Sequence, residues 1–302
     1  MSEVVILGWK DNLEETFVTW SKPPSDSEET RCENAISMIK SAILAHPKLS
    51  TLNIVFIPQG SYHNNTNVKL NSDVDICVKL KDPFFTELPE GMRDEDFGLS
   101  TADYTFTEYK NDVEKALVEK FGQAGVTRGN KAFDVHSNTY RVDADVVACF
   151  EHRRYATDGS FITGTQFFSD SWEKIVNFPE QHYSNGVAKN NATNTYYKKA
   201  VRILKRLKMQ MQDDSISGLD NISSFLIECL VWNVPNEFFT NETFTEDIKD
   251  ILVFLYHATK DDAGCKEWGE VSEFLYLFHS GRPFNRNEVN TFILNAYSHL
   301  FS

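Results

Sequence analysis

Two aspartates alternate with an apolar residue at the start of one predicted strand, and this pattern constrains the chain most strongly. The strand is residues 73–80, DVDICVKL. Side chains at i and i+2 of a strand point to the same face. Asp73 and Asp75 therefore present two carboxylates on one face, with about 6–7 Å between their Cα atoms. At an effective dielectric near 20 such charges repel by about 2–3 kcal/mol. A divalent cation would remove this repulsion, and oxygen ligands favour Mg²⁺ or Mn²⁺.

A second acidic strand is predicted at 139–149. It contains the sequence RVDADVV, with Asp143 and Asp145 on one face. If this strand pairs with the first one, at the usual strand spacing of about 4.8 Å, a third carboxylate joins the cluster. Three carboxylates on adjacent strands can hold two metal ions about 4 Å apart, which stabilises the attacking and the leaving oxygen of a phosphoryl or nucleotidyl transfer. The spacing alone leaves Asp143 and Asp145 as alternatives.

A Gly-Ser pair follows the strand predicted at 52–58. Gly60 allows the backbone to approach a phosphate closely, and the turn after a strand presents free amide groups. Ser61 adds a hydroxyl donor, so a nucleoside triphosphate could lie between this turn and the aspartate pair. A lone D-x-D is usually a solvated strand edge, and Gly-Ser is usually an ordinary turn. The complete combination is much rarer, and we interpret it as a nucleotide site.

The predicted elements divide the chain into two parts. Strands and helices alternate up to residue 188, and only helices follow, which predicts an α+β fold with domains 1–188 and 189–302. A long acidic loop is expected at 82–104, and irregular structure at 150–188. Strands are predicted at 52–58, 73–80, 131–136 and 139–149, and helices at 9–20, 27–46, 105–121, 193–211, 221–232, 245–259, 267–279 and 286–301.

Composition narrows the class of protein. Lys and Arg total 30 against 44 Asp and Glu, which gives a net charge of −14. This charge argues against a protein whose main function is to bind the nucleic-acid backbone. The five cysteines form no C-x-x-C pair, so we expect no zinc site but buried, reduced thiols. We expect no signal peptide, because the first residues have no basic region and only a four-residue apolar run, and the longest later apolar run is 251–256. We therefore expect a soluble, cytoplasmic protein with no membrane partner.

These motifs resemble a known family. Gly60-Ser61 with Asp73-x-Asp75 resembles the hallmark of the polymerase-beta-like nucleotidyltransferase superfamily. The longer stretch, QGSYHNNTNVKLNSDVDI, is similar to the bacterial CD-NTases, which are relatives of cyclic GMP-AMP synthase and oligoadenylate synthase. The resemblance covers about residues 52–235 and includes VDADVVACF (142–150), HRRY (152–155), NFPEQHYSNGVAKN (177–190), YYKKAVRILKRLK (196–208) and SSFLIECLVWNVP (223–235).

The resemblance implies which acids bind metal. Asp73 and Asp75 match the first two metal-binding acids of the family. Asp145 matches the third because it stands directly before a Val-Val pair, whereas Asp143 remains its competitor on the same strand. Many CD-NTases have Pro after that pair where this chain has Ala148, which changes the end of the strand but not the ligand.

The resemblance also implies nucleotide-binding residues. Lys205 resembles the family lysine that contacts the triphosphate, although by itself it reads as a solvated helix charge. Ser224 and Phe225 match a pair that contacts the phosphate and stacks on the base; taken alone they would be a helix cap and a core residue. Together with Gly60 and Ser61, these residues complete the predicted nucleotide site.

The implied fold joins a nucleotidyltransferase lobe, with a mixed central sheet and an N-terminal spine helix, to an all-helical C-terminal lobe, with the active site in the cleft between them. The implied enzyme is a cyclic oligonucleotide synthase, most simply of a cyclic dinucleotide. It would use nucleoside triphosphates (ATP, with GTP, UTP or CTP) and two Mg²⁺ ions, with Mn²⁺ as the substitute, and release pyrophosphate. Its product would be a second messenger of bacterial anti-phage (CBASS) defence, sensed by a separately encoded effector.

Two other functions fit the same residues. One is a nucleotidyltransferase that modifies a different acceptor, such as tRNA or a small molecule. The other is a non-catalytic nucleotide-binding protein that keeps the fold as a scaffold. The zinc-ribbon residues of the DNA-sensing vertebrate relative are absent from the sequence, so no long nucleic-acid activator is expected.

Overall fold

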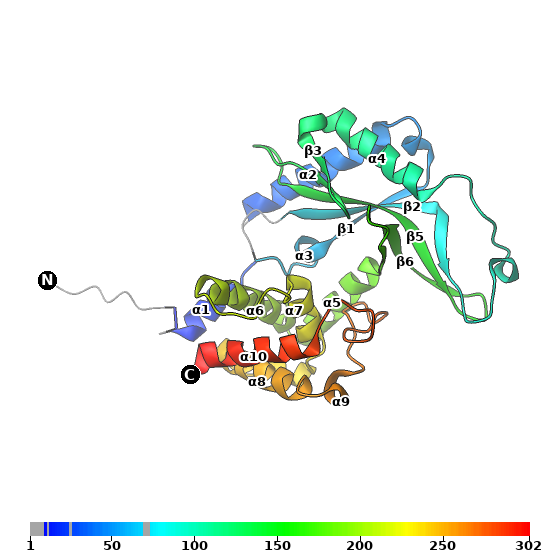
Figure 1. Cartoon of the computed structure of the whole chain (residues 1–302). Helices are drawn as coiled ribbons and strands as arrows, with labels where there is room; N and C mark the ends of the chain where they lie inside the picture. Colours follow the sequence, from blue (N-terminus) through cyan, green and yellow to red (C-terminus); the bar gives the residue numbers. More distant parts are fainter. Residues whose placement is uncertain (1–8, 11, 24–25, 69–72) are drawn as a thin grey trace. The chain divides into compact units, whose positions relative to one another are not determined.

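The computed structural model describes residues 9–10, 12–23, 26–68 and 73–302 of the chain (Figure 1). They form two compact units. The sheet unit comprises the described residues of Ser25–His63 and Lys69–Glu180, and the helical unit comprises those of Met1–Pro24, Asn64–Val68 and Gln181–Ser302. These units do not follow the predicted boundary at 188/189, because the first helix and a short internal stretch group with the helical C-terminal part.

The strands of the sheet unit form one mixed sheet in the described residues, in the order β1-β2-β5-β4-β3. The central pair, β2 and β5, is parallel, and β6 and β7 extend the sheet beside the second half of β5. The strands are β1 (Ile54–Gln59), β2 (Val74–Glu87), β3 (Val126–Arg128), β4 (Phe133–Val135), β5 (Ala144–Tyr155), β6 (Phe161–Phe168) and β7 (Lys174–Asn177).

Two helices, α2 (Asp26–Ala45) and α4 (Phe106–Phe121), cover one face of this sheet (Figure 1). Apolar residues at helical spacing on α2, among them Ile39 and Ile43, share a fully buried core with Ile76 of β2 and Val146 of β5. Tyr109 of α4 anchors this face, because its hydroxyl donates a 2.9 Å hydrogen bond to a β2 carbonyl. The remaining short helix of the unit, α3 (Gly60–His63), follows β1 directly.

The helical unit is built around a separate apolar core. In α6, Val201, Leu204 and Leu207 recur at three-residue spacing and are all buried, which is typical of the inward face of a helix. Its helices are α1 (Leu13–Trp20), α5 (Pro179–Ala192), α6 (Tyr196–Asp213), α7 (Ser224–Trp232), α8 (Phe244–Ala258), α9 (Asp262–Cys265) and α10 (Arg286–Phe301); the first two residues of α5 group with the sheet unit.

Three sequence predictions about secondary structure were wrong. Strand β2 continues to Glu87, so the first part of the loop predicted at 82–104 is strand paired with β5. The stretch 150–188 is not irregular, because it contains the end of β5, then β6, β7 and the start of α5. The helix predicted at 267–279 is absent from these described residues, which contain an isolated bridge between Gly269 and Tyr276.

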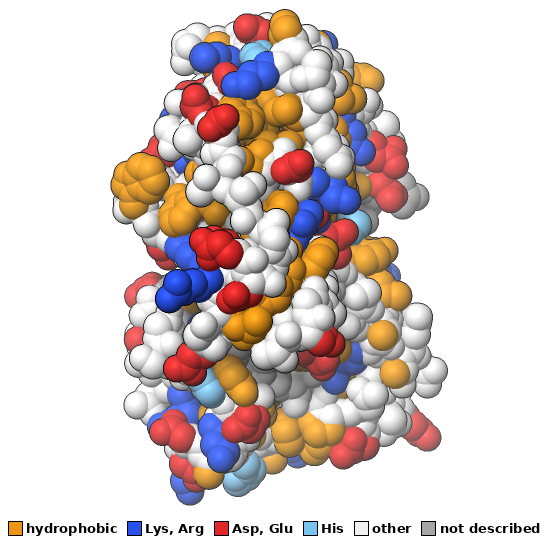
Figure 2. All heavy atoms as spheres, turned by 90° about the vertical axis from the view of Figure 1, so that its right-hand side faces the viewer, with side chains coloured by type: hydrophobic (Ala, Val, Ile, Leu, Met, Phe, Trp, Pro, Cys, Tyr) orange, Lys and Arg blue, Asp and Glu red, His pale blue; other side chains and the backbone are white. Residues whose placement is uncertain are grey.

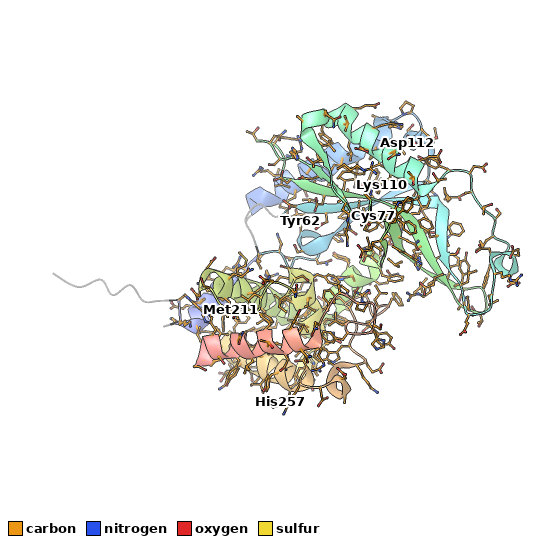
Figure 3. All side chains as sticks on the ribbon, in the orientation of Figure 1. Tyr62, Cys77, Lys110, Asp112, Met211 and His257 are labelled. Carbon is orange, nitrogen blue, oxygen red and sulfur yellow. A yellow bond between two sulfur atoms is a disulfide. The ribbon has the colours of Figure 1, made fainter. Side chains whose placement is uncertain are left out.

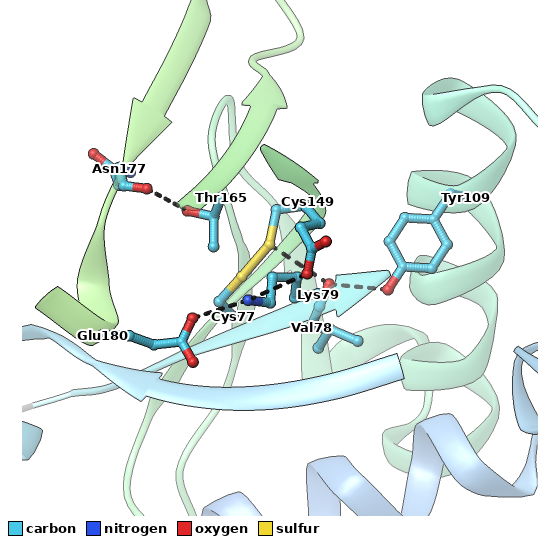
Figure 4. The surroundings of a disulfide bond; sticks show 9 residues. Cys77, Val78, Lys79, Tyr109, Cys149, Thr165, Asn177 and Glu180 are labelled. Carbon is cyan, nitrogen blue, oxygen red and sulfur yellow. Dashed lines mark hydrogen bonds and ion pairs between the residues drawn. A yellow bond between two sulfur atoms is a disulfide. The ribbon is translucent and has the colours of Figure 1, made fainter. Parts of the chain in front are cut away.

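The expectation that every cysteine is reduced was also wrong. Cys77 of β2 and Cys149 of β5 form a disulfide across the two parallel strands (Figures 3 and 4). They can do so because Cys77 is opposite Val147, so that Cys149, two residues further along, projects from the same face of the neighbouring strand. Cys32, Cys229 and Cys265 are buried and form no disulfide, as predicted. Across the described residues, no helix is both long and apolar enough to cross a membrane.

Candidate active site

A row of carboxylates crosses three neighbouring strands of the sheet unit. Asp75 of β2 is the register partner of Asp145 on β5, and Asp145 is in turn opposite Asp134 on β4. Gln59 of β1 continues the row on the other side of Asp75. Asp73, two residues before Asp75, lies exposed just ahead of β2. The sheet therefore sets two of the predicted acids, Asp75 and Asp145, side by side, with Asp73 two residues ahead of Asp75.

The strand alternation determines which face carries these acids. On β2, Val74, Ile76 and Val78 pack into the core beneath α2 and α4, so Asp75 must project from the opposite face. On β5, Ala144 and Val146 belong to the same core and Asp145 lies between them. A one-residue shift in either strand would place a carboxylate in the apolar core, so the core fixes this register.

The carboxylates perturb one another strongly. Burial, followed by the charges of Asp145 and Asp73, raises the pKa of Asp75 to about 7. Burial also raises the pKa of Asp145, and the charges of Asp73, Asp134 and Asp143 add to this rise. Without a cation, the cluster is therefore only partly ionised near neutral pH.

The donor set fits a hard divalent cation, since it consists of carboxylate oxygens that share a face and repel one another. Among the described residues, no three His, Cys, Asp or Glu side chains converge tightly enough to hold an ion as they stand. Asp73 is exposed, and metal binding would require the three carboxylates to close around the ion.

Gly60 lies directly against Asp75. Its φ is +73°, and a Cβ on Gly60 would overlap the Asp75 carboxylate, with the carboxylate carbon only 2.6 Å away. Both the backbone conformation and the available space therefore require glycine here. Ser61 follows in α3, so the predicted Gly-Ser turn is a helical turn that begins at Gly60, beside one of the predicted metal ligands.

Asp143 and Asp145 have different surroundings. Asp143 precedes β5, and its carboxylate accepts a 2.6 Å hydrogen bond from the backbone N–H of Ser137. Asp145 lies within β5, in register with Asp75. Asp143 thus stabilises the chain just before β5, whereas Asp145 is the one placed in the carboxylate row.

The other predicted nucleotide-binding residues lie in the helical unit. Ser224 opens α7, but the helix cap is Ser223, whose hydroxyl accepts from the Leu226 N–H at 3.0 Å. The Phe225 ring is 39% exposed, with the His182 ring centroid 5.8 Å away. Phe225 is thus a half-exposed aromatic rather than a core residue.

Lys205 is buried rather than solvated. Its side chain is 2% exposed, and its ammonium lies 2.9 Å from the Glu228 carboxylate. Neither Glu228 nor Asp134 was predicted from the sequence to be a site residue. A lone acid within the apolar run of α7 was the available signal for Glu228, and the alternation Phe133-Asp134-Val135 was the signal for Asp134.

The fold and the carboxylate row define a nucleotidyltransferase, and comparison with known proteins identifies its family. Residues 184–301 match the family model of the cGAS/DncV-like nucleotidyltransferase C-terminal helical domain. The cyclic dipyrimidine nucleotide synthase CdnE of Cecembia lonarensis is 47% identical over 288 residues, which are 95% of this chain and 98% of that protein. The CdnE of Legionella pneumophila, also named a cyclic dipyrimidine nucleotide synthase, is 44% identical. The match covers 95% of this chain and 97% of that protein.

A solved structure agrees with these relatives. The Elizabethkingia meningoseptica CdnE cyclic dinucleotide synthase, solved with GTP and Apcpp, matches with a TM-score of 0.80 and 35% identity. The match covers 96% of this chain and 99% of that one. The chain belongs to the bacterial CD-NTases, and the predicted family, α+β fold and nucleotidyltransferase class are confirmed.

Proposed function

We propose that this enzyme joins two nucleoside triphosphates into a cyclic dinucleotide, with Mg²⁺ bound by Asp73, Asp75 and Asp145. The observation that carries this proposal is the register of β2 and β5, which sets Asp75 directly beside Asp145 on a polar sheet face. Mn²⁺ could replace Mg²⁺ because both prefer oxygen ligands. Bound metal would neutralise the carboxylates and stabilise the charge that develops on the reacting phosphate.

The residues of the chain have separate roles in the transfer. Gly60 keeps the space beside Asp75 open, and the Ser61 hydroxyl donates to the triphosphate. A ribose hydroxyl of the acceptor loses its proton and attacks the α-phosphorus of the donor, so that a phosphodiester bond forms and pyrophosphate leaves. A second transfer on the linear intermediate releases a second pyrophosphate and closes the ring. Phe225 stacks on a base, and Ser224 contacts a phosphate.

The relatives support a pyrimidine-containing product. The Cecembia lonarensis and Legionella pneumophila proteins are both named as cyclic dipyrimidine synthases, so UTP and CTP are the first substrates to test beside ATP and GTP. We place the product as a second messenger of anti-phage (CBASS) defence that acts on a separately encoded effector in the cytoplasm.

The test is product synthesis by a double variant. Wild-type protein is incubated with all four labelled triphosphates and Mg²⁺ or Mn²⁺, and the products are identified by nuclease digestion and mass spectrometry. Asp73→Asn with Asp75→Asn should abolish synthesis while the protein stays folded, because it removes the charges but keeps the shapes. If this variant retains more than a few per cent of the activity, the metal assignment is wrong.

Long nucleic acid is not expected to activate the enzyme. The net charge is −14, and on the face drawn in Figure 2 the Lys and Arg side chains are interspersed with Asp and Glu. Polymer binding requires clustered positive charge, so duplex DNA or RNA should leave the rate unchanged. A large stimulation that weakens with added salt would contradict this expectation.

A further inference from the structure

The short stretch that separates the Gly-Ser motif from the D-x-D motif is held by the helical unit. Asn64–Val68 follows α3 without a break and precedes Asp73 and Asp75 in sequence. The described residues that precede it and those from Asp73 onward belong to the sheet unit, yet Asn64–Val68 groups with the helical unit. Its position is therefore set by hydrogen bonds with α6 and α7, and most of them involve Thr66.

Thr66, Lys205 and Glu228 form a closed triangle of hydrogen bonds. The Thr66 hydroxyl donates to Glu228 Oε2 at 2.7 Å and accepts from Lys205 Nζ at 3.0 Å. Lys205 Nζ also donates to Glu228 Oε2 at 2.9 Å and to the Thr66 backbone carbonyl at 3.2 Å. The ammonium thus has an acceptor for each of its three donors. All three side chains are buried, with Thr66 fully inaccessible.

The second oxygen of Glu228 extends this cluster to the neighbouring elements. Oε1 lies 3.0 Å from Nε2 of His182 on α5 and accepts from the Asn64 side chain at 3.5 Å. Burial alone would raise the pKa of Glu228, but Lys205 and then His182 hold that pKa well below its ordinary value. The carboxylate is therefore ionised and fully hydrogen-bonded inside the helical unit.

Such a cluster is poorly explained by stability alone. Burying a carboxylate and an ammonium costs several kcal/mol of desolvation, and a buried ion pair often stabilises no more than apolar residues of similar volume. What a buried, directional cluster does provide is a fixed geometry for the groups that it joins. Of the three residues in the triangle, Lys205 and Glu228 belong to α-helices and Thr66 does not. The cluster therefore fixes the geometry of Asn64–Val68, the stretch that contains Thr66.

We infer that Glu228 and Lys205 are positioning residues that hold Thr66, and with it Asn64–Val68, in the geometry that the flanking Gly60-Ser61 and Asp73-x-Asp75 motifs need for catalysis. This inference rests on the proposed role of those two motifs. It also assigns Lys205 a different task from the predicted triphosphate contact: its charge acts through Thr66 and Glu228. Loss of the cluster should let Asn64–Val68 move relative to the two motifs that flank it and slow the chemical step.

Three threonine variants test this inference. Thr66→Val keeps the shape and removes the hydroxyl, whereas Thr66→Ser keeps the hydroxyl. Thr259→Val is the matched control, because Thr259 is equally inaccessible in the helical unit but hydrogen-bonds to Leu255 and Asn290 in α8 and α10. We expect Thr66→Val to lower kcat about 10- to 100-fold with KM changed less than about threefold, and Thr66→Ser to keep kcat within about threefold. Both Val variants should lower the melting temperature similarly.

The outcomes separate this inference from the proposed function. If Thr66→Val keeps the kcat of Thr259→Val, or Thr66→Ser loses as much as Thr66→Val, the positioning role is refuted while the metal assignment stands. If the Asp73 and Asp75 double variant stays active, the proposed function itself fails. Should Thr66→Val not fold, Glu228→Gln with Lys205→Met removes both charges together. If this double variant folds and keeps the wild-type kcat, the inference is overturned. If it folds and its kcat falls, the inference is supported.

Discussion

Gly60 and Asp75 touch so closely that no side chain can stand between them. The two residues are fifteen positions apart, yet the carboxylate carbon of Asp75 lies 2.6 Å from where a Gly60 Cβ would be, and the Gly60 φ is +73°. The glycine expected to approach a phosphate therefore also makes room for a predicted metal ligand. The Gly-Ser and D-x-D motifs are therefore in direct contact within the sheet unit.

Gly60→Ala should reduce kcat/KM at least 100-fold, because the added methyl would displace the Asp75 carboxylate. Gly159→Ala is the matched control. Gly159 has a similar φ of +84°, but its Cβ would meet nothing within 4 Å. Both variants place an alanine at a positive φ and so strain the backbone. Only in Gly60→Ala does the added methyl also overlap a neighbouring side chain, the Asp75 carboxylate. Steady-state kinetics with melting curves will distinguish them, and equal losses of activity in the two variants would contradict the prediction.

Asp145→Asn should be far more damaging to activity than Asp143→Asn. Asp145 is the cross-strand partner of Asp75, whereas Asp143 accepts a hydrogen bond from Ser137 that an amide oxygen can also accept. We expect a loss of at least 100-fold for the first variant and less than about fivefold for the second. The measurement is pyrophosphate release at saturating Mg²⁺. The reverse order would show that Asp143 is the third ligand.

The rate should depend on pH through Asp75. Its pKa of about 7 in the metal-free protein means that the carboxylate gains its charge between roughly pH 6 and 8. Because metal binds the ionised form, activity at limiting Mg²⁺ should rise over this range, and more Mg²⁺ should shift the midpoint to lower pH. Rate profiles at two Mg²⁺ concentrations check this. A midpoint that does not respond to Mg²⁺ would assign the titration to another group.

The same pKa shift predicts how pH affects the stability of the metal-free protein. The folded state keeps the Asp75 proton up to about pH 7, whereas the unfolded chain loses it near 3.8. The contribution of Asp75 to stability is therefore complete below pH 4 and is lost as the pH rises to 7. Asp75→Asn should remove this loss, so that the metal-free variant melts at a higher temperature than wild type at pH 8. Equal melting temperatures would mean that Asp75 is not perturbed.

Local patterns in the sequence were sufficient to predict the central strands and the acids on them. The alternation in 73–80 and 142–147 specifies one apolar and one acidic face, so Asp75 and Asp145 follow from the period of two. The parallel pairing that sets these acids side by side could not be derived in this way. It depends on contacts between segments about 70 residues apart, and no local pattern encodes that register.

The missed elements have a common physical cause. Residues 161–168 and 174–177 are strands because they pair with β5 and each other, although glycine and polar residues weaken their local signal. The alternative interpretation of Lys205 as a solvated helix charge was wrong, because its partner Glu228 lies 23 positions away on another helix. Propensity and spacing describe a residue's neighbours in sequence, whereas burial and ion pairing depend on neighbours in space.

Reduction of the disulfide should destabilise the sheet unit. The bond between Cys77 and Cys149 closes a loop with a sequence separation of 72, so its loss should cost about 2–4 kcal/mol. We expect a reductant to lower the melting temperature of wild type but not that of Cys77→Ala with Cys149→Ala. Cys265→Ala, which removes a free buried thiol, should keep the sensitivity of wild type. Intact-mass measurement after thiol labelling checks the bond, and five labelled thiols in unreduced, denatured protein would show that it is absent.

Ser61→Ala should impair the use of the triphosphate without harming the fold. Ser61 follows Gly60 at the start of α3, and a hydroxyl there can donate to a charged phosphate oxygen. Such a hydrogen bond is worth roughly 1.5–3 kcal/mol, so its loss should lower kcat/KM about ten- to a hundredfold. Ser160→Ala offers a control, since that hydroxyl lies in an exposed turn and donates to Asp158. An unchanged kcat/KM in Ser61→Ala would contradict the predicted hydrogen bond to the triphosphate. Gly60-Ser61 would then be an ordinary turn in which only the glycine matters, because it allows the close approach to Asp75.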